Sequence, residues 1–215
     1  VQTCALPICE HFQRVEHHLL AVPGASLKTL KTAHSHVHAL GQCRKAIRKL
    51  GLKAVVAADT AGAAAEVAAS GDKTRAAIAS SLAGEIYGLR SLRKNIEDAA
   101  HNTTRFIVLS RKAIDPDPAK GKVMTTFVFR VRNVPAALYK AMGGFATNGV
   151  NMTKLESYLV GGGFVAAQFY AEVDGHPLHT NMRLALEELD FFSREVRILG
   201  VYPAHPFRKQ QRAAE

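Results

Sequence analysis

Thr104, Arg105 and Phe106 are the residues whose types and spacing point most directly to chemistry, because a hydroxyl and a guanidinium stand next to each other. A guanidinium can pair with a carboxylate through two parallel hydrogen bonds. A threonine hydroxyl can donate a hydrogen bond to a leaving oxygen, but it is a weak acid. Its help would therefore be positional and electrostatic rather than free proton donation. For Arg105 taken alone, an ordinary surface salt bridge is an equally good explanation.

Histidines form a second group with possible chemistry. His34, His36 and His38 alternate, so on a strand they would share one face and could bind zinc. No cysteine or carboxylate completes a four-ligand set at a plausible spacing, and a helix over part of the segment would scatter the rings. Neither a metal site nor a cofactor is therefore expected. The glycines at 84–88 lack a following Lys-Ser/Thr, and those at 161–163 open no helix, which excludes phosphate and dinucleotide loops.

The first residues, Val1–Ile8, have no periodicity and join abruptly to a charged segment. They back-translate into a common sequencing-library adapter, so we set them aside as a read-through artefact, with Cys9 at the junction. They lack the basic start and apolar stretch of a secretion signal. On this interpretation, the chain is part of a longer gene product. Cys43 is then the one secure cysteine, which fits a reducing cytoplasm.

Composition and charge bound the remaining possibilities. No apolar run is long enough to span a bilayer, so a soluble, cytoplasmic protein is expected and a membrane partner is not. The net charge of +10 is uneven, because residues 26–112 hold 15 Lys and Arg against 6 Asp and Glu. No basic run interleaved with aromatics indicates nucleic-acid binding, and there is no Trp. The positive field could concentrate a small dianion, or it could simply keep the protein in solution.

The periodicity divides the chain near residues 113–122, AIDPDPAKGK, whose prolines, glycine and scattered charges are typical of a linker. Before it, strands and helices alternate, which favours a parallel α/β architecture. Strands are expected at 29–35, 54–58 (buried), 75–79 and 103–109, and helices at 36–50, 60–69 and 82–89.

After the linker the expected order is βαββαβ, the split βαβ or ferredoxin-like arrangement. Strands are expected at 122–131, 150–159, 164–173 and 197–202. Pro135 opens one helix that runs toward Gly143, and a second covers 181–192. Gly161–Gly163 forms the hairpin turn.

This second region resembles an ACT domain, the small-molecule sensor of amino-acid metabolism. Pro135-Ala136-Ala137-Leu138 is similar to the family's Gly-Ala-Leu loop, with Ala136 where glycine is usual. Glu156-Ser157-Tyr158-Leu159 keeps the Glu-Ser of the family's Glu-Ser-Arg-Pro stretch and loses Arg-Pro. Backbone N–H groups at a helix start can hold an amino-acid carboxylate. Alternatively, Glu156 and Ser157 only cap a strand end. The resemblance implies effector contacts at Ala136, Ala137, Leu138, Asn151, Glu156 and Ser157.

The first region resembles the second lobe of prephenate dehydratase, whose catalytic half is built like a periplasmic binding protein. Ser35–Cys43, SHVHALGQC, is similar to the family stretch Ser-His-Pro-Gln-Ala-Leu-Ala-Gln-Cys, and Thr104-Arg105-Phe106 matches its Thr-Arg-Phe triplet. The expected fold is α/β, with a partial catalytic lobe followed by a ferredoxin-like ACT domain. The expected boundaries are 1–8 artefact, 9–112 partial catalytic domain, 113–121 linker, 122–208 ACT regulatory domain and 209–215 tail.

The resemblance implies conversion of prephenate to phenylpyruvate, with loss of water and carbon dioxide, in L-phenylalanine biosynthesis. It implies Thr104 as the catalytic group that assists the leaving hydroxyl. Arg105, Ser35 and Gln42 would bind substrate, with Ser35 at a strand end and Gln42 on the following helix. Phe106 belongs to the same substrate-binding group and is expected to pack beneath the site. L-phenylalanine would be the inhibitory effector.

Two further interpretations stay open. The chain could be a non-catalytic amino-acid sensor, although the intact Thr-Arg-Phe triplet speaks against this. It could also be the C-terminal part of a bifunctional chorismate mutase and prephenate dehydratase. A homodimer or homotetramer is expected, with a dimer seam near Leu138. Because an upstream lobe would supply the other half of the cleft, we expect little or no turnover from this chain alone.

Overall fold

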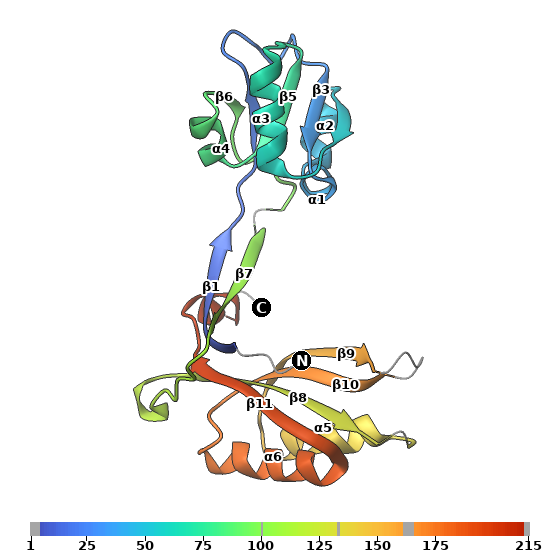
Figure 1. Ribbon diagram of the computed structural model, residues 1–215, viewed down its shortest axis with the longest axis vertical. Helices are drawn as coiled ribbons and strands as arrows, with labels where there is room; N and C mark the ends of the chain where they lie inside the picture. Colours follow the sequence, from blue (N-terminus) through green and yellow to red (C-terminus); the bar gives the residue numbers. More distant parts are fainter. Residues whose placement is uncertain (1–4, 100, 133, 161–165, 213–215) are drawn as a thin grey trace. The chain divides into compact units, whose positions relative to one another are not determined.

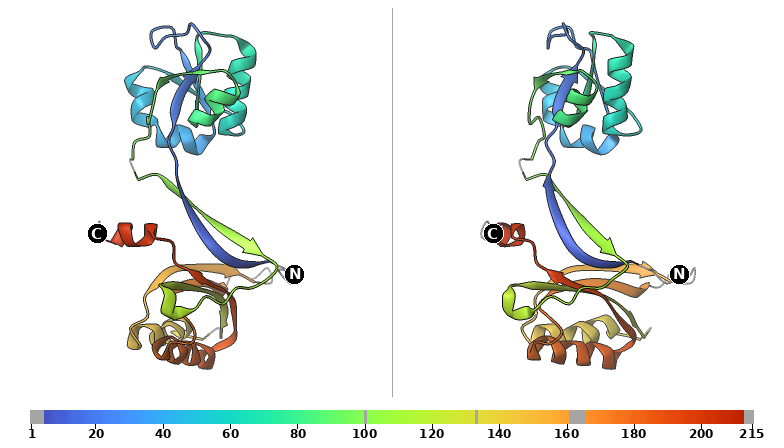
Figure 2. Two further views of the ribbon diagram at one scale, coloured as in Figure 1. Left: turned by 90° about the vertical axis from the view of Figure 1, so that its left-hand side faces the viewer. Right: turned by 60° about the vertical axis from the view of Figure 1, so that its left-hand side comes forward.

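The computed structural model describes residues 5–99, 101–132, 134–160 and 166–212. The chain divides into two compact units. The mixed-sheet unit is Gln13–Thr104, and the antiparallel-sheet unit joins Val1–Phe12 to Arg105–Glu215. The two boundaries therefore fall inside strands β1 (Leu6–Arg14) and β7 (Thr103–Ser110), which pair as a two-stranded sheet (Figure 2).

The mixed-sheet unit is built on five strands in the order β4-β3-β5-β2-β6. β3 pairs parallel with β4 and β5, whereas β2 pairs antiparallel with β5 and β6. The sheet is mixed, and the expectation of a parallel sheet was only partly right. Its elements are β2 (His18–Ala21), β3 (Thr32–Ser35), α1 (Val37–Gln42), α2 (Arg44–Lys49), β4 (Lys53–Val56), α3 (Thr60–Ser70), β5 (Arg75–Ala79), α4 (Ser81–Ile86) and β6 (Arg90–Arg93).

Helices cover both faces of this sheet, which explains the apolar runs of its central strands. Leu19 packs in one core cluster with residues of α1 and α2, and its neighbour Leu20 packs in another with residues of α3 and α4. Successive residues of a strand face opposite sides, so one strand serves both clusters. Cys43 is buried in the first cluster, and burial raises the pKa of its thiol to about 12.

Two expectations for this unit were wrong. The helix expected over 36–50 is broken at Cys43 into α1 and α2. The carboxylate of Asp98 accepts a hydrogen bond from the amide of Lys45 at 3.0 Å, so a distant residue caps the start of α2. The strand expected to be buried at 54–58 is β4, which lies at the sheet edge and leaves Val56 66% exposed.

The antiparallel-sheet unit follows the expected βαββαβ succession. Its four-stranded sheet has the order β11-β8-β10-β9, with every neighbour antiparallel, as in the split βαβ arrangement. The elements are β8 (Val123–Val131), α5 (Ala137–Thr147), β9 (Met152–Leu159), β10 (Ala166–Asp174), α6 (Thr180–Phe192) and β11 (Ser193–Pro203). A 3-10 turn (Pro118–Lys120) lies in the expected linker, and α7 (Phe207–Arg212) follows β11.

The two faces of this sheet differ in character. Helices α5 and α6 pack against one face around Phe127, Phe129 and Phe145 (Figure 1). The other face carries the buried polar side chains of Thr126, Glu172 and Tyr202. This polar face is where the unit's charged cluster forms, as described below.

Some sequence-based boundaries in this unit also shift. Helix α5 begins at Ala137, two residues after Pro135, and extends past Gly143 to Thr147.

The hairpin turn at Gly161–Gly163 lies outside the described residues, as does Cys4. Leu6–Ile8, which we had set aside, begins strand β1. None of the helices in the described part of the chain is long and apolar enough to cross a membrane.

Candidate active site and charged cluster

Gln42, at the end of α1, lies in a small polar group of the mixed-sheet unit. Its amide pairs with that of Asn102, with Gln42 Nε2 donating to Asn102 Oδ1 at 3.2 Å and Asn102 Nδ2 donating to Gln42 Oε1 at 3.0 Å. The ring nitrogen Nε2 of the buried His17 lies 2.8 Å from the same Gln42 oxygen. These contacts fix the orientation of a side chain for which the family resemblance implies substrate binding.

A cavity of about 450 Å³ opens beside this group. Its lining residues are Gly41, Gln42, Arg44, Glu97, Asp98, Ala99, His101, Asn102 and Thr103. Ser35 ends β3, as expected, but it is fully buried and its hydroxyl donates to the carbonyl of Ile78 at 2.6 Å. The structure thus gives Gln42 an accessible position and Ser35 a buried one.

Thr104 and its neighbours alternate along β7. The side chain of Thr104 is exposed, whereas that of Arg105 turns toward the sheet of the antiparallel-sheet unit. Like Thr104, Phe106 is exposed, at 54%, and its expected packing beneath a bound substrate stays a prediction. Alternation along the strand explains this result, because the residue after an inward arginine must face outward.

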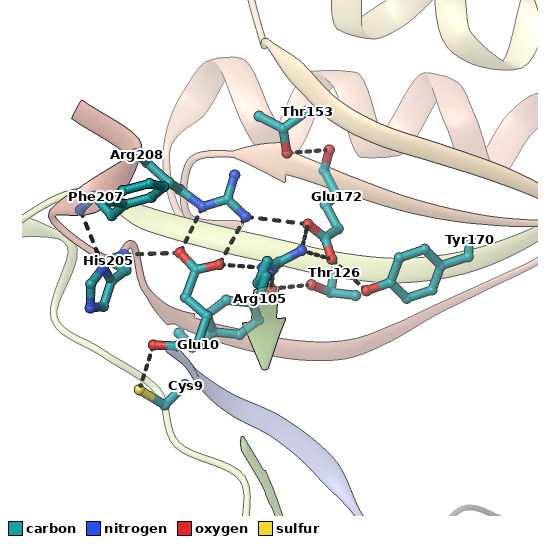
Figure 3. Close-up of polar contacts among 11 residues, drawn as sticks. Cys9, Glu10, Arg105, Thr126, Thr153, Tyr170, Glu172, His205, Phe207 and Arg208 are labelled. Carbon is teal, nitrogen blue, oxygen red and sulfur yellow. Dashed lines mark hydrogen bonds and ion pairs between the residues drawn. The ribbon is translucent and has the colours of Figure 1, made fainter. Parts of the chain in front are cut away.

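Arg105 lies in a charged cluster on the polar face of the antiparallel-sheet unit (Figure 3). Its Nε donates to Glu10 at 2.7 Å, its Nη1 to both oxygens of Glu172 at 2.9 and 2.7 Å, and its Nη2 to the hydroxyl of Tyr202 at 3.0 Å. Arg208 of α7 also donates to Glu10, at 2.6 and 2.8 Å. The two carboxylate side chains are 0% and 1% exposed, so the cluster is buried and internally paired.

Hydrogen bonds and neighbouring charges in the cluster keep Glu10 and Arg105 ionised. Burial alone would raise the pKa of the Glu10 carboxyl, but the guanidinium of Arg208 and the amide of His205 outweigh it and lower that pKa. Burial works against the charge of Arg105, and hydrogen bonding to Glu172 overcomes it, so the pKa of Arg105 is raised. Burial and the same carboxylate raise the pKa of Tyr170, whose hydroxyl therefore stays protonated.

The lowered pKa of Glu10 predicts acid sensitivity. The stabilisation is fully present above the unfolded-state pKa of about 4.3 and is lost as pH falls through the lower folded-state value. We expect Glu10→Gln to be less stable than the wild type at pH 7 and to have a shallower dependence of its free energy of unfolding below about pH 5. Denaturant unfolding at several pH values measures this dependence. Glu195→Gln, at an exposed ion pair, should keep the wild-type slope; equal slopes for both variants would contradict the assignment.

The residues predicted to bind an effector divide into two groups within the antiparallel-sheet unit. Ala136 precedes α5 with φ of 60°, in the left-handed region that favours glycine, and Ala137 and Leu138 begin the helix. On β9, Glu156 accepts from the hydroxyl of Tyr158 at 2.8 Å and from Lys154 at 3.0 Å, next to the exposed Ser157. Asn151, just before β9, donates to Asp174 at 2.8 Å.

The three alternating histidines do not share a strand face. His34 lies on β3 and contacts Thr32 and Arg75, whereas His36 caps α1 and His38 lies within it. Within the described residues, no group of three or more His, Cys, Asp or Glu side chains is arranged to hold a metal ion.

Comparison with known proteins identifies the family. The family model for prephenate dehydratase matches residues 5–114, which is more than half of the chain. The chain belongs to the prephenate dehydratase family. Because the match begins at residue 5, it includes residues 5–8 of the N-terminal segment interpreted above as an artefact.

Relatives in this family share most of the chain. A bifunctional N-acyl-homoserine lactone acylase/prephenate dehydratase of Komagataeibacter europaeus is 55% identical over 94% of this chain and 72% of its own length. Arogenate dehydratase/prephenate dehydratase 1 of Arabidopsis thaliana is 36% identical over 88% of this chain, which spans 52% of the relative. The structure of prephenate dehydratase from Arthrobacter aurescens in complex with L-Phe has a TM-score of 0.83 at 29% identity, covering 94% of this chain and 67% of that chain.

Several residues of the two polar groups, the one around Gln42 and the charged cluster around Arg105, were not predicted from the sequence. Glu10, Glu172 and Arg208 were not singled out, and neither were His17 and Asn102 as partners of Gln42. One signal was available, since Glu172 is the one acidic residue inside the apolar strand run FYAEV. A charge at such a position requires a partner.

Proposed function

We propose that this chain belongs to an enzyme that converts prephenate to phenylpyruvate, with loss of water and carbon dioxide. Membership of the prephenate dehydratase family carries this proposal, together with the unchanged Thr104-Arg105-Phe106 triplet. Thr104 would donate a hydrogen bond to the leaving hydroxyl, and the amide group of Gln42 and Asn102 would orient a carboxylate or hydroxyl of the substrate. Formation of phenylpyruvate from prephenate, followed by its absorbance, tests the activity directly.

The other residues predicted to bind substrate have different roles in this proposal. Ser35 would act from beneath the site, because it is buried and bonded to a backbone carbonyl. Phe106 is exposed and available to a ligand. Arg105 already has protein partners for all three guanidinium nitrogens, and another role is proposed for it below.

We propose further that residues 122–208 form an ACT domain and that the mixed-sheet unit is one lobe of a periplasmic-binding-protein-like catalytic half. The chain spans 72% of the Komagataeibacter relative and about half of the plant relative. Because a cleft between lobes needs both walls, this chain alone should turn over prephenate slowly. Assembly at least as a dimer, near Leu138, belongs to the same proposal.

L-phenylalanine is the proposed effector, bound near the start of α5 and at Glu156. Its binding should stabilise the chain by about 2.7 kcal/mol at a hundredfold excess over the dissociation constant. Calorimetric titration with L-phenylalanine, with L-tyrosine as the comparison, measures binding, and thermal unfolding measures the stabilisation. The helix start offers dipole and N–H groups for the ligand carboxylate. If a folded chain gives no heat and no stabilisation, the effector assignment fails.

A second candidate activity is deacylation of N-acyl-homoserine lactones. The observation in its favour is that the 55% identical relative bears this activity in its name, whereas the plant dehydratase is 36% identical. Release of homoserine lactone from an N-acyl-homoserine lactone tests it. An active preparation that makes phenylpyruvate and releases no lactone would eliminate this candidate.

A further inference from the structure

The charged cluster of the antiparallel-sheet unit is closed around Arg105. The acceptors of its guanidinium are Glu10, Glu172 and Tyr202, and its side chain is only 20% exposed. A substrate carboxylate could pair with Arg105 only by displacing one of these buried carboxylates, whose charge-assisted hydrogen bonds are 2.7 to 2.9 Å long. Arg105 is therefore an anchor in this structure rather than a vacant carboxylate receptor.

This anchor is adjacent to the proposed catalytic residue. Thr104 and Arg105 are consecutive residues of β7, and their side chains face opposite ways. Glu10, which completes the cluster, lies on β1, the strand that pairs with β7. Holding Arg105 against Glu172 of β10 thus fixes the backbone that carries the Thr104 hydroxyl.

A line of polar contacts continues from Glu172 toward the predicted effector residues. The hydroxyl of Tyr170 donates to Glu172 at 2.5 Å, and the ammonium of Lys154 lies 5.4 Å from the centre of the Tyr170 ring. Lys154 also pairs with Glu156 at 3.0 Å. The pairing of β9 with β10 sets these positions, because Tyr170 is opposite Glu156 and Glu172 is opposite Lys154.

We propose that Glu172 is a positioning residue for Thr104, and that the contacts through Tyr170 and Lys154 couple Glu172 to an effector bound at Glu156. This inference rests on the proposed function. An amino-acid effector carries an ammonium group that can pair with Glu156 and so compete with Lys154 for it. Any release of Lys154 changes the electrostatic environment of Tyr170 and its bond to Glu172. An effector can shift β7 in this way only if its affinity differs between two arrangements of the chain, one with Lys154 paired to Glu156 and one with Lys154 released.

The anchoring part is tested without any ligand. Hydrogen–deuterium exchange of the amides at 103–110 is compared between the wild-type chain and Glu172→Gln. Loss of one buried partner should accelerate exchange there by about tenfold or more. Glu195→Gln, which removes an exposed carboxylate from β11, is the matched control and should leave the rate unchanged. Equal rates in wild type and Glu172→Gln would overturn the positioning role.

The coupling part is tested with Tyr170→Phe, which removes one hydroxyl and keeps the ring over which Lys154 lies. L-phenylalanine should alter exchange at 103–110 in the wild type. In Tyr170→Phe it should bind but change that exchange by less than half as much, a difference that a merely structural tyrosine would not produce. Tyr87→Phe, in the mixed-sheet unit, should respond as the wild type does.

The outcomes separate this inference from the proposed function. An undiminished L-phenylalanine response in Tyr170→Phe would overturn the coupling. Absence of any L-phenylalanine binding by the wild type would overturn both the effector assignment and the coupling built on it. The positioning role of Glu172 would still be decided by the ligand-free comparison.

Discussion

Arg105→Met should destabilise the antiparallel-sheet unit by about 3 kcal/mol or more. The substitution keeps most of the apolar stem and removes the guanidinium that holds Glu10 and Glu172. Two nearly inaccessible carboxylates would then share the single guanidinium of Arg208, which lies at 2.6 Å from the first and 3.4 Å from the second. An unpaired buried charge costs much more than the net value of the pair that it has lost.

Denaturant dependence of hydrogen exchange gives the free energy of unfolding for each unit separately. Amides of α5 and α6 report on the unit that contains Arg105, and amides of α3 report on the mixed-sheet unit as an internal reference. Arg105→Lys, which keeps the charge but cannot form the same forked contacts, should fall between wild type and Arg105→Met. Arg130→Met removes an exposed partner of Glu195 at 3.7 Å and should cost no more than about 1 kcal/mol. A similar small loss for Arg105→Met would show that the cluster does not stabilise the fold.

Local sequence signals predicted a helix or strand correctly where residues at its own ends mark its first and last residues. Helix α3 is an example, since Asp59 accepts a hydrogen bond from the Gly62 amide at 2.6 Å and Gly71 ends the helix with φ of 61°. Strand β5 was predicted at its observed bounds, Arg75–Ala79, because a short apolar run lies between polar segments. Each of these signals acts within a few residues of its target.

Contacts between residues far apart in the sequence could not be predicted. Asp98 bonds to both sides of the break between α1 and α2, since its amide donates to the carbonyl of Gln42 at 2.6 Å and its carboxylate accepts from the amide of Lys45 at 3.0 Å. Periodicity alone could not reveal this, because the apolar stripe continues across Cys43. Likewise, Arg105 lies 95 residues from Glu10 and 67 from Glu172. The arginine was found as a possible charge partner, and its actual partners required the fold.

The candidate site shows the same division. Ser35 at the end of a strand and Gln42 on the next helix were placed correctly from the local pattern. The pairing of Gln42 with Asn102 crosses 60 residues and joins two segments that no periodicity connects. The exposed side chain of Phe106 follows from strand alternation once Arg105 is known to face inward. The inward direction of the Arg105 side chain could not be predicted without the partners that it meets in the charged cluster.

Thr104→Val should reduce turnover of prephenate by about 10² to 10³-fold, the range expected for loss of one positioned hydrogen-bond donor to an oxygen that gains negative charge. Valine has nearly the shape of threonine and suits a strand, so β7 should remain intact. The exposed position of Thr104 also means that no buried hydroxyl partner is lost. The effect should therefore appear in kcat, with the fold and L-phenylalanine binding unchanged.

The assay requires the enzyme at the length of its relatives, since this chain alone is proposed to turn over slowly. Thr104→Ser retains the hydroxyl and should recover most of the rate, which separates hydrogen bonding from strand packing. Combining Thr104→Val with Glu172→Gln gives a further test, because a residue that acts only by positioning Thr104 has nothing left to position. The double variant should then be no slower than Thr104→Val. If the two losses multiply instead, Glu172 affects turnover by another route, and a Thr104→Val enzyme with normal kcat would remove Thr104 from the mechanism altogether.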